Sequence, residues 1–163
     1  MGYGSLNISK YTTSDPTVNF IGTWNSTPNA SNNTSSLELT IYVTKSTGIA
    51  LYDETVTTSI QVSANGGNGQ IKTETVTLAL DPGRINQQTI YHQIFTVPHD
   101  SFGDCSALIS TSVSGYLQAT GVQTIQLDHI ELPPLVTLAL QSVTETSASI
   151  NWGADSEIGR AHV

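Results

Sequence analysis

Apolar and polar residues alternate along most of this chain, and the alternation predicts β-strands. Side chains two positions apart lie on the same face of a strand, so an apolar residue at every second position marks a strand with one buried face. No segment combines the 3.6-residue period of an amphipathic helix with capping residues. Five strand faces can be followed: Val18, Phe20, Gly22 and Trp24; Leu37, Leu39, Ile41 and Val43; Val56, Thr58, Ile60 and Val62; Val76, Leu78 and Leu80; Ala107, Ile109, Thr111 and Val113.

Turn-forming residues separate these strands. Residues 64–69 have the sequence Ala-Asn-Gly-Gly-Asn-Gly, which supplies the positive φ angles of a hairpin turn. Asp81-Pro82-Gly83 predicts a further turn, and 28–33 a polar loop. Residues 90–97 carry apolar side chains on both faces, which predicts a central strand. Short strands about ten residues apart predict an all-β fold, namely a two-sheet antiparallel β-sandwich with jelly-roll-like connections.

The charge balance excludes several classes of partner. Only 11% of the 163 residues are charged, yet Asp and Glu outnumber Lys and Arg by 13 to 5, which gives a net charge of −8. Such a surface repels phosphate backbones and anionic lipids, so we expect neither a nucleic-acid nor a membrane partner. No apolar run reaches the ~20 residues of a membrane-spanning helix. Neutral glycans and proteins remain as partners.

Cysteine content and the N-terminal residues bear on the cellular compartment. Cys105 is the only cysteine, which excludes an internal disulfide and a cysteine-based zinc site. The first residues, Met-Gly-Tyr-Gly-Ser, have neither the basic nor the apolar region of a secretory signal. These features are consistent with assembly in a bacterial cytoplasm.

A change of pattern near residue 131 predicts a domain boundary. We expect a β-sandwich over 1–131, a linker at 131–134, and a second β segment within 132–158. Residues 135–152 resemble the start of a fibronectin type III domain: a proline precedes a first strand, then a turn and a second strand that ends in Trp152. Such a domain needs roughly 100 residues, so we interpret the segment as truncated. Residues 159–163 are interpreted as a cloning remnant.

Four places in 18–134 resemble tail proteins of phages that infect Gram-positive bacteria. The first is Trp24, a polar loop and the sequence Asn-Asn-Thr-Ser at 32–35, followed by an alternating strand. The second is Ile-Gln-Val at 60–62, which leads into Asn65-Gly66. The third is Thr-Val-Pro-His at 96–99 with a glycine at 103, which is similar to the family's V-x-H-N-x-D-G turn. The fourth is the strand at 125–130 before the linker.

Two departures from the family pattern limit what is transferred. Phe102 stands where the family's third motif has an aspartate, which weakens any metal site at that turn. The linker also differs, with His-Ile-Glu-Leu-Pro at 129–133. The resemblance implies a tail-tip, fibre or baseplate-associated protein. Such proteins contain β-sandwich modules similar to carbohydrate-binding modules, often joined to fibronectin-like repeats.

Four tyrosines are the candidate ligand-binding residues: Tyr42, Tyr52, Tyr91 and Tyr116. Sugar binding requires aromatic platforms with hydrogen-bonding neighbours. Tyr42 lies opposite the apolar face of its strand, so we expect it to face solvent or a second layer. Aromatic side chains on strands also serve as packing residues or cross-strand pairs, and this interpretation stays open for each tyrosine. Trp24 belongs to an apolar face and is assigned to the core.

The sequence offers no convincing catalytic or metal site. A Cys105–His99 pair lacks the orienting third group of a nucleophilic site, and a buried thiol is the simpler interpretation. Asp53 and Glu54 are adjacent and should point to opposite faces, unlike a glycosidase pair. Asp100, Ser101 and Asp104 supply oxygen ligands suited to calcium, but their spacing lacks a full set of oxygen ligands. Hydrogen bonding by Asp100 within the turn is the more ordinary explanation. For His99 we expect bonds to the backbone of the turn.

We therefore expect a non-enzymatic phage tail module, without cofactor or metal, that binds host cell-wall polysaccharide during adsorption. The expected location is the virion, and the expected protein partners are other tail or baseplate proteins, with a homo-oligomer as a further candidate. A structural spacer or assembly module without glycan binding is the alternative. A glycan-degrading domain is the third hypothesis. An exposed aromatic groove would favour the adsorption module. A smooth hydroxyl-rich surface would favour the spacer, and converging carboxylates would favour the glycan-degrading domain.

Overall fold

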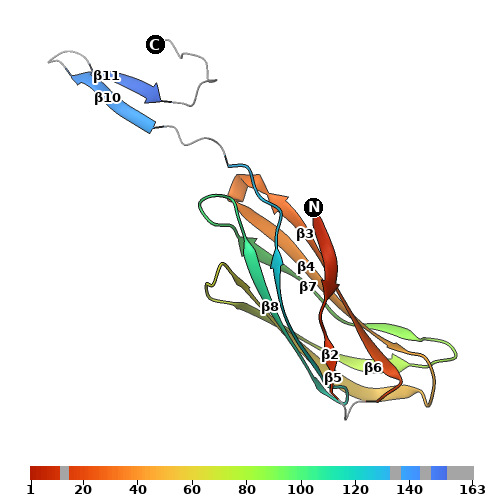
Figure 1. Cartoon of the computed structure of the whole chain (residues 1–163). Coiled ribbons are helices and arrows are strands. Elements are labelled where there is room, and N and C mark those ends of the chain that lie inside the picture. Colours follow the sequence, from red (N-terminus) through yellow and green to blue (C-terminus); the bar gives the residue numbers. More distant parts are fainter. Residues whose placement is uncertain (12–14, 133–136, 144–147, 154–163) are drawn as a thin grey trace. The chain divides into compact units, whose positions relative to one another are not determined.

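The computed structural model is built from β-strands (Figure 1). It describes residues 1–11, 15–132, 137–143 and 148–153, the last two segments as backbone only. The chain divides into two compact units, Met1–Glu131 and Leu132–Val163. Among the described residues, no helix is long and apolar enough to cross a membrane.

Met1–Glu131 is a sandwich of two antiparallel sheets, which confirms the predicted fold class. The four-stranded sheet has the order β1 (Gly2–Leu6), β3 (Val18–Asn29), β4 (Thr34–Lys45) and β7 (Gln87–Pro98). The five-stranded sheet has the order β2 (Ser9–Lys10), β9 (Ala119–Gln126), β8 (Ser106–Gly115), β5 (Leu51–Ala64) and β6 (Gln70–Leu80). A single 3₁₀ turn at Ala30–Asn32 joins β3 to β4.

Six of the seven strands from β3 to β9 follow the order of an immunoglobulin-like sandwich. Of the seven strands from β3 to β9, the first, second and fifth lie in one sheet and the others in the second sheet. Constant-type immunoglobulin domains place strands A, B, E and D against C, F and G. Only the fourth strand, β6, differs, because it pairs with β5. The expected jelly-roll-like order is wrong, because direct pairing makes neighbours of β3 and β4, β5 and β6, and β8 and β9.

The inward faces of the two sheets form the core, as the alternation predicted. Leu37, Leu39, Ile41 and Val43 of β4 are all 0% exposed. Facing residues of β5 and β8 are buried with them, and Phe20 and Trp24 pack against this cluster while partly exposed. The predicted turn at 64–69 joins β5 to β6, with positive φ at Asn65 and Gly66. The period of two therefore identified the inward face of each of these strands.

Strand β7 lies at the edge of its sheet, so its prediction as a central strand is wrong. A register irregularity pairs Ile41 with Tyr91 but Tyr42 with Thr89. The extra residue makes both Ile90 and Tyr91 point inward, and both are 0% exposed. A β-bulge, not burial of two faces, thus accounts for the buried Ile90, while Ile94 on the same parity is 51% exposed.

Side chains close the gap between the edge strands β6 and β7. Three side chains of β6 bond the backbone of β7: Gln70 Nε2 donates to Thr96 O (2.6 Å), Lys72 Nζ donates to Ile94 O, and Glu74 Oε2 accepts from His92 N (2.6 Å). In return, the Tyr91 hydroxyl donates to Lys72 O and Gln88 Nε2 donates to Thr77 O. These bonds satisfy backbone groups that an edge strand otherwise offers to another chain.

The second unit contains one antiparallel pair, β10 (Thr137–Val143) and β11 (Ala148–Gly153). Its register places Leu138 opposite Trp152. Two strands were expected here, and both are present. The residues assigned to a cloning remnant, 159–163, lie outside the described residues.

Candidate functional site

The four candidate tyrosines lie in three different environments. Tyr91 is 0% exposed in the core, where burial raises the pKa of its hydroxyl, so it is excluded as a ligand contact. Tyr42 is half-buried on the outer face of the four-stranded sheet, as expected. Tyr52 and Tyr116 are 51% and 46% exposed. These last two line the same groove, so the structure brings together two of the four predicted residues.

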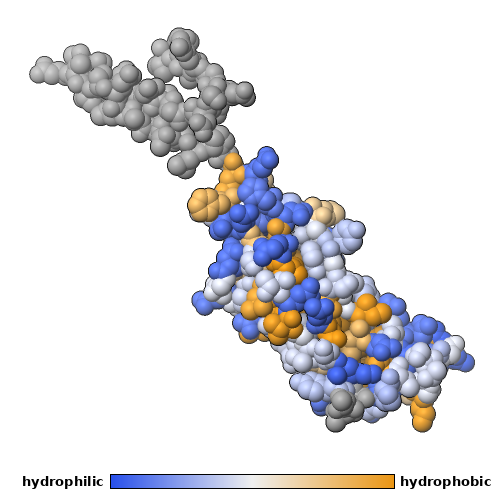
Figure 2. Space-filling model, in the orientation of Figure 1, coloured by the Kyte–Doolittle hydropathy of each residue, from blue (hydrophilic) through white to orange (hydrophobic). Residues whose placement is uncertain are grey.

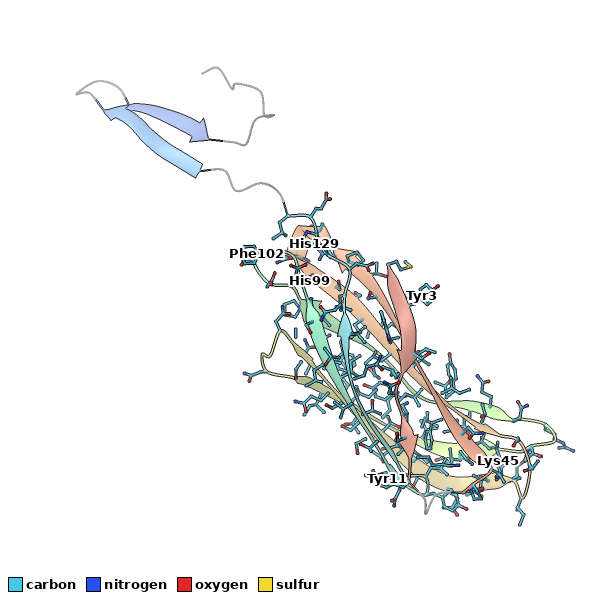
Figure 3. The ribbon with its side chains drawn as sticks, in the orientation of Figure 1. Tyr3, Tyr11, Lys45, His99, Phe102 and His129 are labelled. Atoms are coloured by element: carbon cyan, nitrogen blue, oxygen red, sulfur yellow. The ribbon has the colours of Figure 1, made fainter. Side chains whose placement is uncertain are left out.

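This end groove, of about 380 Å³, lies where β4 ends, β5 begins and β8 turns into β9. Figure 3 shows Lys45 at this end of the sandwich, with His99 and Phe102 at the opposite end. The groove mixes aromatic, aliphatic, hydroxyl and charged groups. Its lining residues are Asp15, Thr17, Lys45, Gly48, Ile49, Ala50, Leu51, Tyr52, Glu54 and Tyr116.

A β-bulge in β5 shapes one wall of the groove. Tyr52 pairs with Ala79 and Thr55 with Thr77, so Asp53 and Glu54 stand opposite one residue of β6. Asp53 has φ +63°, a left-handed conformation that Asp tolerates better than most residues. Bulges re-aim side chains and recur beside functional sites. Here Tyr52 and Glu54 both line the groove.

A glycine brings the second tyrosine to the same wall. Gly115 has φ +104°, and a Cβ atom on it would lie 2.5 Å from Thr55 O. The turn can therefore pack directly on the bulged part of β5, where Tyr116 N donates to Thr55 O (3.1 Å). Tyr116 thereby comes beside a strand segment about sixty residues earlier in the chain.

The Tyr52 ring is fixed at its hydroxyl. Tyr52 donates to Asp81 Oδ2 at 3.1 Å. Partial desolvation raises the pKa of the Tyr52 hydroxyl, and the hydrogen bond to Asp81 raises it further. With the hydroxyl engaged and half of the side chain exposed, the ring is presented as a platform.

An ion pair forms the base of the groove. Lys45 is 1% exposed, and its Nζ bonds Asp15 Oδ2 (2.7 Å) and Thr17 Oγ1 (2.6 Å). The Lys45 bond, together with hydrogen bonds from Thr17, lowers the pKa of Asp15 to about 2. Lys10 Nζ donates to the carbonyls of Asp15, Pro16 and Val18, which holds the loop before β3. The only cation of the lining is thus already neutralised by a lining carboxylate.

The lining of the groove holds two carboxylates, Asp15 and Glu54. A glycosidase acid needs a raised pKa to hold its proton, whereas Asp15 is driven towards the ionised form. Glu54 is exposed, and the other carboxylate of the lining, Asp15, is bound to Lys45. Across the described part of the chain, no three His, Cys, Asp or Glu side chains are grouped to hold a metal ion.

The turn between β7 and β8 is held together by hydrogen bonds among its own residues. Asp100 Oδ1 accepts from Phe102 N (2.8 Å) and Asp104 N (2.9 Å), and these bonds lower its pKa. Hydrogen bonding within the turn therefore accounts for Asp100, as one of the two interpretations had it. Gly103, with φ +86°, packs against the carbonyl of Ile130.

His99 and Cys105 form no catalytic pair. His99 is 8% exposed, and its Nδ1 lies 2.8 Å from Gly103 O while Nε2 lies 2.8 Å from Ser35 Oγ. Both ring nitrogens are thus engaged, and the expected bond to the turn backbone is confirmed. Cys105 is 2% exposed; burial, and then the Asp100 charge, raise the pKa of its thiol to about 11. The buried-thiol interpretation is confirmed.

Sequence reasoning did not identify Glu54, Asp15 or Ile49 as neighbours of the tyrosines. One signal was available for Glu54: the alternation breaks between Leu51 and Val56, where four polar or amphipathic residues follow one another. Such a break is typical of a bulge. Comparisons of the chain with protein-family models, with curated proteins and with solved structures gave no match.

Proposed function

We propose that Met1–Glu131 is a non-enzymatic module that binds carbohydrate in the end groove. The supporting observation is that Tyr52 and Tyr116, partly exposed and remote in sequence, line one groove with hydrogen-bonding neighbours. The C–H faces of a sugar ring pack on aromatic rings, while its hydroxyls need donors and acceptors. Glu54 and Thr17 provide such groups in the same lining.

The location of the groove supports the same proposal. In variable immunoglobulin domains the loops at one end of the sandwich form the binding surface. The loops after β4 and β8 correspond by strand order to two of those loops, and both contribute to the groove. Loops on a rigid scaffold are common binding positions.

The biological setting follows from the resemblance of 18–134 to phage tail proteins. We propose a tail-associated protein of the virion that contacts cell-wall polysaccharide of a Gram-positive host and binds other tail or baseplate proteins. The net charge of −8 disfavours phosphate-bearing wall polymers. Neutral polysaccharides are therefore the preferred ligand class.

A structural spacer is the second candidate, and the outer face of the five-stranded sheet favours it. Beyond the bulge at the start of β5, none of the described outward-facing positions of β5, β6, β8 and β9 is ionisable, and most carry hydroxyls. The Thr57 and Thr75 hydroxyls bond each other at 2.9 Å. In the view of Figure 2, apolar side chains form small separate patches rather than one surface. A smooth face of this kind fits packing between tail components.

Binding to purified cell-wall polysaccharides and to intact Gram-positive cells tests the proposal. We expect saturable binding that Tyr52→Ala and Tyr116→Ala each weaken by about tenfold, equivalent to 1.4 kcal/mol. Tyr11→Ala is the matched control, since Tyr11 is 50% exposed and does not line the groove. A folded chain that binds none of these materials would refute glycan binding and leave the spacer. Equal loss in all three variants would refute the assignment of the groove.

A further inference from the structure

A second hollow, which shares no residue with the end groove, lies on the outer face of the four-stranded sheet. It has a volume of about 290 Å³, at the lower end of the range for small-ligand sites. Strands β1, β3 and β4 supply its lining, which consists of Tyr3, Gly4, Thr23, Trp24, Asn25, Glu38 and Thr40.

The strand register places complementary groups side by side in this hollow. Tyr3 pairs with Asn25, and Asn25 pairs with Glu38, so an aromatic ring, an amide and a carboxylate form one cross-strand row. Thr23 and Thr40 pair in the next row on the same face. Directly paired side chains lie about 5 Å apart, so these groups can reach a single small ligand together.

Glycine in β1 explains why the tyrosine stands beside this row. Gly4 pairs with Trp24, and a Cβ atom on Gly4 would lie 2.7 Å from Trp24 Nε1. Only a residue without a side chain lets β1 lie this close to the indole. Tyr3 then projects from the opposite face of β1 and is 84% exposed (Figure 3). None of the described residues of Met1–Glu131 covers this ring, which leaves both of its faces available for stacking.

A histidine orients the carboxylate. His92 of β7 pairs with Thr40, and its Nε2 lies 2.7 Å from Glu38 Oε1. The Glu38 side chain remains 41% exposed. A carboxylate held in this way can accept hydrogen bonds from adjacent hydroxyls of a ligand. The lining contains no Lys or Arg, so it offers no counter-charge to a phosphate.

We propose that this sheet hollow is a second sugar-binding site, which takes a single neutral or amino-bearing pyranose unit. Tyr3 stacks on the ring, Glu38 accepts from ring hydroxyls or an amino group, and Asn25 with the two threonines completes the hydrogen bonds. His92 is a positioning residue, because it acts through Glu38. The proposal does not depend on the end groove, since the two sites use different residues.

Backbone amide chemical shifts resolve the two sites in one experiment. The whole chain is titrated with neutral hexoses, N-acetylglucosamine and glucosamine up to about 10 mM, which would fill a site of Kd about 1 mM to roughly nine-tenths. We expect at least one sugar to shift the amides of residues 3, 23–25 and 38–40. Shifts confined to residues 49–54 and 116 would support the end groove and overturn the sheet hollow.

Variants complete the test. Tyr3→Ala and Glu38→Gln should each weaken the sugar-induced shifts at the sheet hollow by about tenfold, and His92→Gln by a smaller factor. Tyr11→Ala, an exposed tyrosine outside both hollows, should leave them unchanged. Unaltered amide shifts elsewhere would show that Tyr3→Ala keeps the fold. The proposal is overturned if no sugar shifts these amides, or if Tyr3→Ala leaves the titration unchanged.

Discussion

The ion pair under the end groove predicts an asymmetry between its two partners. Lys45 is 1% exposed, whereas the Asp15 side chain is 21% exposed. The Lys45 ammonium has two side-chain acceptors, Asp15 Oδ2 and Thr17 Oγ1. Removing the carboxylate charge therefore leaves a buried cation, but removing the ammonium leaves an anion that water can reach.

The sizes of the two effects follow from this difference in burial. Asp15→Asn keeps the shape of the side chain and removes its charge, and leaving one partner of a buried pair uncompensated costs about 3–5 kcal/mol. Lys45→Met keeps most of the buried aliphatic chain. Asp15 then retains its bonds from Thr17, so we expect a loss of about 1 kcal/mol. The two variants should thus differ by at least about 2 kcal/mol.

Urea unfolding followed by circular dichroism measures both losses. The pH dependence adds a second test, because the pKa of Asp15 is lowered to about 2, below the ordinary value of about 3.9. A depressed pKa contributes stability that is complete above about pH 4 and is lost as the pH falls through 2. Asp15→Asn should therefore flatten the stability profile between pH 4 and pH 2.

Two results would refute this reasoning. If Lys45→Met destabilised the chain as much as Asp15→Asn, burial of the ammonium would not control the energy of the pair. If the Asp15→Asn profile kept the full slope below pH 4, the acid sensitivity would come from other carboxylates. Asp53→Asn, at an exposed position outside the pair, is the control for loss of one negative charge.

Three further predictions concern the turn at the opposite end and the sandwich edge. Gly103→Ala should lower the free energy of unfolding in urea by at least about 1–2 kcal/mol, because φ is +86° and the new Cβ would meet Ile130 O at 2.0 Å. Unchanged stability would contradict this packing of the turn. Burial raises the pKa of the Cys105 thiol to about 11, so little thiolate forms at pH 8. Cys105 should therefore react with iodoacetamide at pH 8 about 200-fold more slowly in the folded chain than in urea. Comparable rates would contradict its burial. Glu74→Ala should accelerate hydrogen exchange at the His92 amide roughly fivefold, because it removes the hydrogen bond from His92 N to Glu74, which is worth about 1 kcal/mol. An unchanged exchange rate would show that this bond does not protect the edge of β7.

The strands and their inward faces could be predicted because a period of two is a local property of the chain. The connections between sheets could not, because they depend on which distant strands pair. Tyr91 illustrates the local limit. It shares the parity of the buried Phe95 and Val97, but Ile90 and Ile94 on the other parity left the inward face undetermined, so a core residue was taken as a candidate ligand contact.

The candidate site was predicted only in part, for a related reason. Tyr52 and Tyr116 could be selected as aromatic residues, but their convergence depends on a bulge at Asp53 and on the close packing of Gly115. For Tyr3, the pattern of neighbouring residues offered even less indication of a ligand contact. This tyrosine stands between two glycines in a short segment without apolar alternation, and its value as a platform depends on Asn25 and Glu38 of other strands.

Placement, rather than exposure, supports assigning these tyrosines to ligand sites. Isolated aromatic residues on a protein surface are normal and by themselves indicate no function. A spacer could carry Tyr3, Tyr52 and Tyr116 at any outward position. Instead, each lines a hollow in which a carboxylate and hydroxyls lie within reach. Beyond the bulge at the start of β5, the outward-facing positions of β5, β6, β8 and β9 have the hydroxyls but neither ionisable side chains nor tyrosines. Because a sugar needs both a stacking surface and directional hydrogen bonds, the two hollows fit the ligand and the smooth face fits a packing role.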